Sequence, residues 1–213
     1  MDHLSDLRNI VNKPVIEFVA NVKAGEHGCI FFTSKEVMKD IQFVFIKSGL
    51  ENNWGVVYAT ATESIEQVRY SMKNYGIDTA RFEGNDSLII IKGEDLYKNP
   101  ENPDLENWKS VAKSISQKFI ANGKKGVRIA ADLSSYFLSK GLTKQWFDLE
   151  YALERKIALP MSVVCGYNII IPGLWDMDIL RYYKKINEEN KEYVDTHSFV
   201  IYASKYKNKI FTI

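Results

Sequence analysis

The sequence of 213 residues is poor in the residues that build disulfide scaffolds and metal centres, with two cysteines, three histidines and five prolines. Two cysteines, Cys29 and Cys165, are too few for a disulfide framework and are typical of a reducing compartment. No apolar run approaches the roughly 18 residues that a membrane-spanning helix needs. The N-terminal segment 1–6 is polar and acidic, whereas a signal peptide is basic and then apolar. These absences predict a cytoplasmic protein that does not enter a membrane.

An excess of charge of either sign is also missing. The chain has 28 Lys+Arg against 27 Asp+Glu, a formal net charge of +1. No global field therefore attracts it to nucleic acid or to an anionic membrane, and we expect neither as a direct partner. A hydrophobic content of 46% is ample for a core and excludes a disordered polar chain.

Short apolar runs alternate with amphipathic segments along the chain. Predicted strands are 29–33, 55–59, 88–91, 127–131, 161–167 and 199–202, and predicted helices are 34–49, 62–76, 104–122, 143–157 and 176–187. Segment 93–103, with its Asn-Pro pairs, is predicted to be a loop, and 204–213 a hairpin return. Gly49, Gly76 and Gly123 are predicted to end helices. The alternation predicts an α/β protein with three layers, a mostly parallel sheet covered by helices on both faces.

The first strand-to-helix turn lacks a phosphate-binding loop. Such a loop needs glycines whose N–H groups surround a phosphate, and a lysine followed by Ser or Thr. The turn contains no glycine, and Lys35 is followed by Glu36, whose charge repels phosphate. The sequence therefore argues against phosphoryl transfer. Asp132 follows strand 127–131, and in nucleotide hydrolases an aspartate at such a position holds magnesium. Because the phosphate-binding loop is missing, we prefer the interpretation that Asp132 caps the next turn.

Polar residues at strand ends are the first candidates for a site. In parallel sheets ligands bind outside the carboxyl ends of the strands. That rule selects Thr33, Ser34, Thr60, Asp132, Tyr167 and Asn168.

A second set of candidates contains imidazole and thiol groups. His27 and Cys29 are two residues apart on an extended segment and so share one face. With Cys165 and His197 they could bind a metal ion, or a thiol could act as a nucleophile, but buried cysteines are also ordinary core residues. Glu150 lies on a predicted helix and belongs either to a site or to a solvated helix face.

These residues together resemble the MEDS domain, the sensory domain described from methanogens and methylotrophs. The matching segments are 25–36, 45–50, 56–58, 127–129, 148–150 and 164–168, with His197 near the end. They lie within about residues 20 to 203. Two positions depart from the family pattern: Asn168 replaces a frequent aspartate, and Ser198 replaces a frequent proline.

The resemblance implies a degenerate relative of RecA/KaiC-type ATPases, a RecA-like sheet without a phosphate-binding loop. It further implies a non-catalytic sensor of small molecules, with simple hydrocarbon derivatives as ligands and a signalling protein as partner. We predict neither a catalytic residue, nor a metal ion, nor a cofactor. The predicted ligand-binding residues are His27, Cys29, Thr33, Ser34, Glu150, Cys165 and Tyr167. The alternatives are a metal- or thiol-dependent enzyme that uses His27, Cys29 and Cys165, and a nucleotide-binding partner subunit of a RecA-like ATPase.

We expect residues 1–22 to be an N-terminal extension, suited to docking or to formation of a homodimer, and 23–213 to be the MEDS-like domain. The sequence pattern does not say whether His27 and Tyr167 lie close together. In parallel strands, His27 at the start of the first strand and Tyr167 near the end of the fifth lie at opposite edges of the sheet. Whether they line one pocket cannot be deduced from the pattern.

Overall fold

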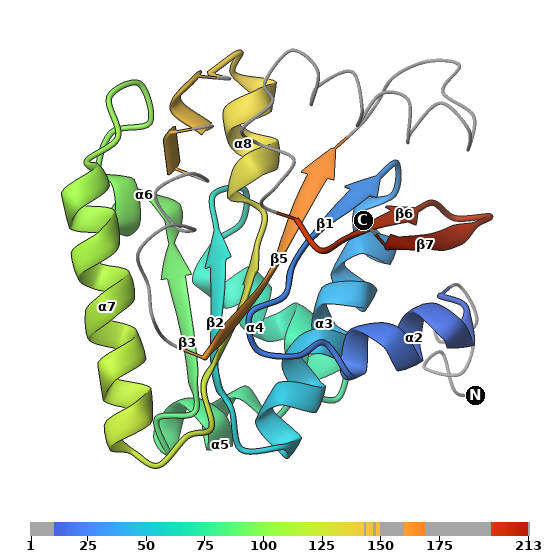
Figure 1. Ribbon diagram of the computed structural model, residues 1–213, viewed down its shortest axis with the longest axis horizontal. Helices are drawn as coiled ribbons and strands as arrows, with labels where there is room; N and C mark the ends of the chain where they lie inside the picture. The colour runs from blue at the N-terminus through green and yellow to red at the C-terminus, as the bar shows by residue number, and fades with distance from the viewer. Residues whose placement is uncertain (1–10, 143, 147, 150–159, 169–196, 213) are drawn as a thin grey trace.

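The strands form one seven-stranded sheet with the order β3-β2-β4-β5-β1-β6-β7 (Figure 1). The computed structural model describes residues 11–142, 144–146, 148–149, 160–168 and 197–212. All neighbouring strands run parallel except β6 and β7, which are antiparallel. The strands are β1 His27–Phe32, β2 Gly55–Thr60, β3 Leu88–Lys92, β4 Val127–Ala131, β5 Met161–Asn168, β6 Phe199–Ala203 and β7 Asn208–Thr212. Each predicted strand is present, and the predicted mostly parallel α/β sheet is confirmed.

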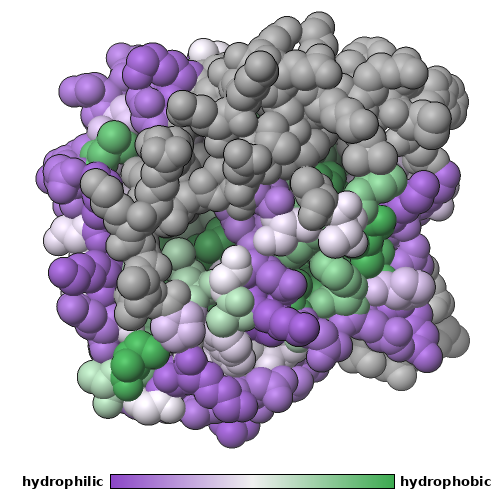
Figure 2. Space-filling view, viewed as in Figure 1, coloured by the Kyte–Doolittle hydropathy of each residue, from purple (hydrophilic) through white to green (hydrophobic). Residues whose placement is uncertain are grey.

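Helices cover both faces of the sheet. They are α2 Lys13–Ala20, α3 Lys35–Glu51, α4 Ile65–Asn74, α5 Thr79–Gly84, α6 Gly93–Tyr97, α7 Leu105–Ala121 and α8 Leu133–Ser139. Helix α7 confirms the prediction for 104–122: the Asp104 side chain caps it by accepting a hydrogen bond from Asn107 N at 2.8 Å. Figure 2 shows a predominantly hydrophilic surface along the side of the molecule that α7 forms, as expected for an amphipathic helix.

Three helix predictions need correction. Segment 93–103 contains the short helix α6 rather than only loop, because a helix of five residues has too few turns to show periodicity. Helix α4 is capped by Ser64 and not by Thr62, whose hydroxyl is bonded to Asp132. Gly49 lies inside α3 and does not end it; a Cβ there would lie 2.8 Å from the side chain of Arg128. Gly76 and Gly123, by contrast, have positive φ, as predicted.

Strand alternation divides the core into two layers. On one face of the sheet, Ile30, Tyr58 and Val164 pack with α2, α3 and α4. On the other, which we call the α7 face, Cys29 and Cys165 pack with residues of α6, α7 and α8. Both faces of the central strands are thus buried, which explains the continuous apolar run that begins at Cys29.

Arg128 links α2 to the rest of the fold. It projects from β4 and is 4% exposed. Its Nη2 donates to Ala20 O at 3.2 Å and Val22 O at 2.9 Å, and its Nη1 donates to Phe45 O at 2.9 Å and Ser48 Oγ at 2.6 Å. Burial lowers the Arg128 pKa to about 10, so the guanidinium remains charged at neutral pH.

The described helices include none that is long and apolar enough to cross a bilayer.

Candidate functional site

Asp132 is bonded to the connection between β2 and α4. It follows β4 and is 2% exposed. Its carboxylate accepts hydrogen bonds from Ala61 N at 2.7 Å, from Thr60 Oγ1 at 3.1 Å and from the Thr62 hydroxyl. It makes no side-chain bond to α8, the helix that it precedes. Three protein donors thus use most of the acceptor positions of the carboxylate that a magnesium site would need.

Lysines at the carboxyl edge of the sheet face Glu63. Lys39 Nζ lies 2.7 Å from Glu63 Oε1, and Lys35 Nζ lies 3.4 Å from Glu63 Oε2. Lys92 Nζ donates to the backbone oxygen of Glu63 at 2.9 Å. One carboxylate of the chain itself therefore pairs with two of these ammonium groups and neutralises part of the positive charge that could attract a phosphate.

The N-terminus of α3 carries a negative charge of the chain itself, the carboxylate of Glu36. Ser34 caps the helix by accepting from Val37 N at 3.4 Å, and its hydroxyl donates to Glu36 Oε2 at 2.8 Å. The Ser34 hydrogen bond, together with the Glu36 backbone N–H and nearby lysines, lowers the Glu36 pKa despite its partial burial. At this position the negative charge of Glu36 interacts favourably with the helix dipole and repels an incoming phosphate.

Asp40, one turn further along α3, makes stability depend on pH. Burial, and secondarily the charge of Glu36, raises the Asp40 pKa to about 6, against a smaller opposing effect of Lys39. Between about pH 4 and 6 the folded state therefore binds more protons than the unfolded state, and stability falls as pH rises. We expect Asp40→Asn to melt at a higher temperature than the wild type above pH 6 and to lose this advantage at pH 4. Thermal melts across this range check the prediction, and a pH-independent difference would contradict it.

The predicted imidazole and thiol residues gather on the α7 face. Alternation along β1 places His27, Cys29 and Phe31 on this side, and alternation along β5 places Cys165 and Tyr167 there. Cys29 and Cys165 are register partners on adjacent strands, and both are buried thiols that form no disulfide bond. Buried thiols in an apolar layer are suited to packing and to contact with a ligand rather than to nucleophilic attack.

His197 connects the two residues whose proximity the sequence left open. The His27 and His197 rings lie 4.2 Å apart, centroid to centroid, and the Tyr167 ring lies 6.5 Å from that of His197. Tyr167 also contacts Phe31 and Trp146, each with centroids 5.3 Å apart. His27 and Tyr167 therefore belong to one buried aromatic cluster, although His27 lies at the start of β1 and Tyr167 lies near the end of β5.

A pocket opens beside this cluster, between the sheet and α7 and α8. Its enclosed volume is about 50 Å³, within a larger hollow of about 680 Å³ that includes its opening. Apart from Ser134 and Cys165, the lining side chains among the described residues are apolar or aromatic. They are Val57, Ala59, Leu96, Trp108, Ala112, Ile115, Ile129, Ala131, Leu133, Phe137, Trp146, Leu149 and Val163. Such a lining selects neutral, mainly apolar molecules.

The structure brings together only part of the predicted site. Cys165 lines the pocket, and His27, Cys29 and Tyr167 lie in the adjoining layer. Thr33 and Ser34 lie at the start of α3, where Thr33 N donates to Ala203 O at 3.0 Å and Ser34 serves as the helix cap. Glu150 lies outside the described residues. Among the residues that the structure describes, no three His, Cys, Asp or Glu side chains are placed to hold a metal ion.

The pocket aromatics Trp108 and Trp146 lie in the segments predicted as helices, 104–122 and 143–157, and were not among the predicted site residues. Both are buried. Helical periodicity identifies a buried side chain but does not distinguish one that fills a core from one that borders a cavity.

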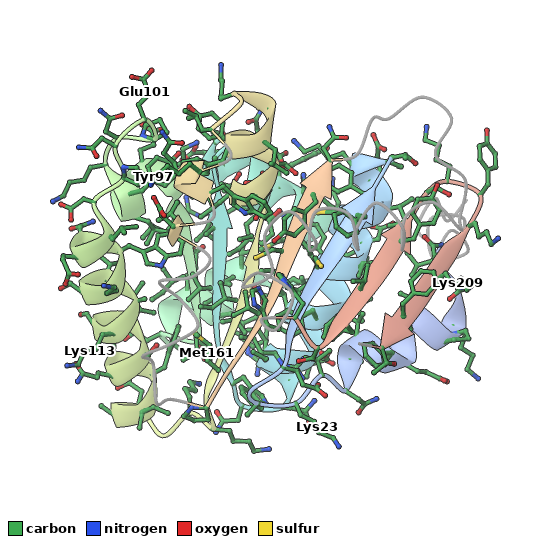
Figure 3. The ribbon with its side chains drawn as sticks, turned by 45° about the horizontal axis from the view of Figure 1, so that its top comes forward. Lys23, Tyr97, Glu101, Lys113, Met161 and Lys209 are labelled. Carbon is green, nitrogen blue, oxygen red and sulfur yellow. The ribbon has the colours of Figure 1, made fainter. Side chains whose placement is uncertain are left out.

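Tyr97 and Met161, labelled in Figure 3, lie at opposite ends of the sheet, and Lys113 points outward from α7.

Solved structures define the class of this fold. A KaiC-like protein from the hyperthermophilic archaeon Pyrococcus horikoshii OT3 matches with a TM-score of 0.57 and 14% sequence identity. The match covers 89% of this chain and 78% of that chain. The chain thus has a RecA-like α/β fold, as predicted.

The family follows from the sequence match. The family described as "MEDS: MEthanogen/methylotroph, DcmR Sensory domain" matches residues 26–173, more than half of the chain. The chain belongs to the MEDS family, and the predicted resemblance is confirmed. A comparison with curated protein sequences finds no match.

Proposed function

We propose that this protein is a non-catalytic, cytoplasmic sensory module that binds a small neutral molecule in the pocket of the α7 face and signals to a protein partner. The observation that carries the proposal is the apolar pocket enclosed by the sheet, α7 and α8. Membership of a sensory-domain family supports it. The hydrogen bonds of Asp132 and the ion pairs of Glu63 support it further, because both carboxylates already have partners within the protein.

The size of the pocket favours a small ligand. Its enclosed part, about 50 Å³, is larger than the roughly 10–15 Å³ that one water molecule needs. With no charged side chain among its described lining, the pocket would leave an ionic ligand unpaired, which is costly.

The position of the pocket suggests how occupancy is transmitted. Ala59 and Val163 line it from the sheet, whereas Trp108 and Phe137 line it from the helices. A ligand there contacts both layers and favours whichever spacing of helix and sheet fits it best. The surface of α7 and α8 would then present a different shape to the signalling partner.

Filling the pocket tests this proposal. Ala112 lines it from α7, so Ala112→Leu places extra carbon atoms in the cavity. Neutral compounds of one to five carbons serve as ligands in thermal melts. At ten times its Kd, a binding compound stabilises the wild type by about 1.4 kcal/mol, which raises the Tm by roughly 3–6 °C. We expect Ala112→Leu to abolish this shift.

Lys113→Leu provides the control, because Lys113 is the next residue of α7 and points away from the sheet (Figure 3). We expect it to respond to the compounds as the wild type does. The proposal fails if no compound raises the wild-type Tm, or if the two variants respond alike.

A further inference from the structure

Trp108, one of the residues that line the pocket, carries an unusual polar group. Its side chain is only 7% exposed, lines the cavity and packs in the core layer of the α7 face. Its indole Nε1–H is buried and has no hydrogen-bond partner among the residues that the structure describes. Buried tryptophans usually bond this group, and an unsatisfied buried donor costs stability. A bound molecule with an acceptor would remove that cost.

We propose that Trp108 is a specificity-determining residue whose indole N–H donates a hydrogen bond to the ligand. The ligand class is then a small neutral molecule with one acceptor oxygen, such as a small ketone or ether. This inference rests on the proposed function, because it assumes that the pocket is the binding site. It goes further in that it distinguishes oxygenated molecules from plain hydrocarbons of the same shape.

The other lining groups agree with this choice. Ser134, Trp146 and Cys165 also line the pocket, but each already has an interaction within the protein. Among the described lining residues, Trp108 is therefore the donor available to a ligand. The remaining described lining is apolar and fits the carbon atoms of the ligand.

Acetone and isobutene form a matched pair of probes, because they share a shape and differ in the acceptor oxygen. Titrations of the full chain followed by ¹⁵N–¹H spectra of the indole groups give the Kd of each probe, with the Trp108 signal assigned through Trp108→Phe. We expect acetone, but not isobutene, to move the Trp108 indole proton downfield, with the signal of Trp54 unchanged. Trp108→Phe removes ring contacts for both probes, so the ratio of their affinities isolates the hydrogen bond. We expect the preference for acetone to fall about fivefold.

The outcomes separate this inference from the function on which it rests. If both probes bind and Trp108→Phe leaves the affinity ratio unchanged, the hydrogen bond is refuted while the pocket remains a binding site. If neither probe binds, and Ala112→Leu also has no effect on any compound tested, the pocket itself is refuted as the site, and this inference with it.

Discussion

Arg128→Ala is expected to lower the free energy of unfolding by at least about 3 kcal/mol. The guanidinium donates to the backbone oxygens of Ala20, Val22 and Phe45, and all three would lose a donor. The truncation would also leave a cavity beneath the rings of Phe45 and Trp54. Urea unfolding measures the loss, which corresponds to a Tm decrease of roughly 6–12 °C.

The same variant should release α2 from the domain. Amide hydrogen exchange of residues 13–20 is expected to accelerate more than exchange in β4, because the Ala20 and Val22 contacts are lost selectively. Arg69→Ala is the control: Arg69 pairs with Glu83 at the surface, and we expect a loss below about 1 kcal/mol. Equal destabilisation by the two variants would refute the importance that we assign to Arg128.

Asp132→Ala is expected to cost about 2–4 kcal/mol, because it removes a buried carboxylate that accepts from Ala61 N and from the hydroxyls of Thr60 and Thr62. Lys35→Ala, at a half-exposed ion pair, is expected to cost less than about 1 kcal/mol. Chemical denaturation of both variants measures these losses.

We expect neither substitution to change the binding or the hydrolysis of ATP. The turn before α3 has no glycine, and Glu36 occupies its helix N-terminus, so we expect millimolar MgATP to leave the wild-type Tm unchanged. ATP turnover by the wild type that either substitution abolished would instead support the alternative of a retained nucleotide site.

The sheet was predictable from the sequence because its central strands are buried on both faces. A run such as 29–32 must be covered on each side, and its spacing from the next helix requires a parallel crossover. Helix α7 was equally predictable, with Asp104 as its cap and a regular apolar stripe. The short helices α6 and α8 were not, because five or seven residues complete too few turns to establish a period.

The candidate site was predictable only in part. Alternation correctly placed His27 and Cys29 on one face, but the contact of His27 with His197 depends on how the chain returns to β6. The pocket was harder still. Its Trp108 belongs to the same stripe as a core residue such as Phe119, and only the distance between helix and sheet distinguishes them. That distance arises from tertiary packing, which periodicity does not encode.

In our proposal, a RecA-like scaffold without a phosphate-binding loop binds a small neutral molecule between its sheet and α7. A crystal pressurised with xenon tests it most directly, because xenon enters apolar cavities whatever the natural ligand is. We predict a xenon atom in contact with Trp108, Ala112 and Leu133, and none at this position in Ala112→Leu. A pocket that stays empty, or is filled by side chains of the protein itself, would contradict the account.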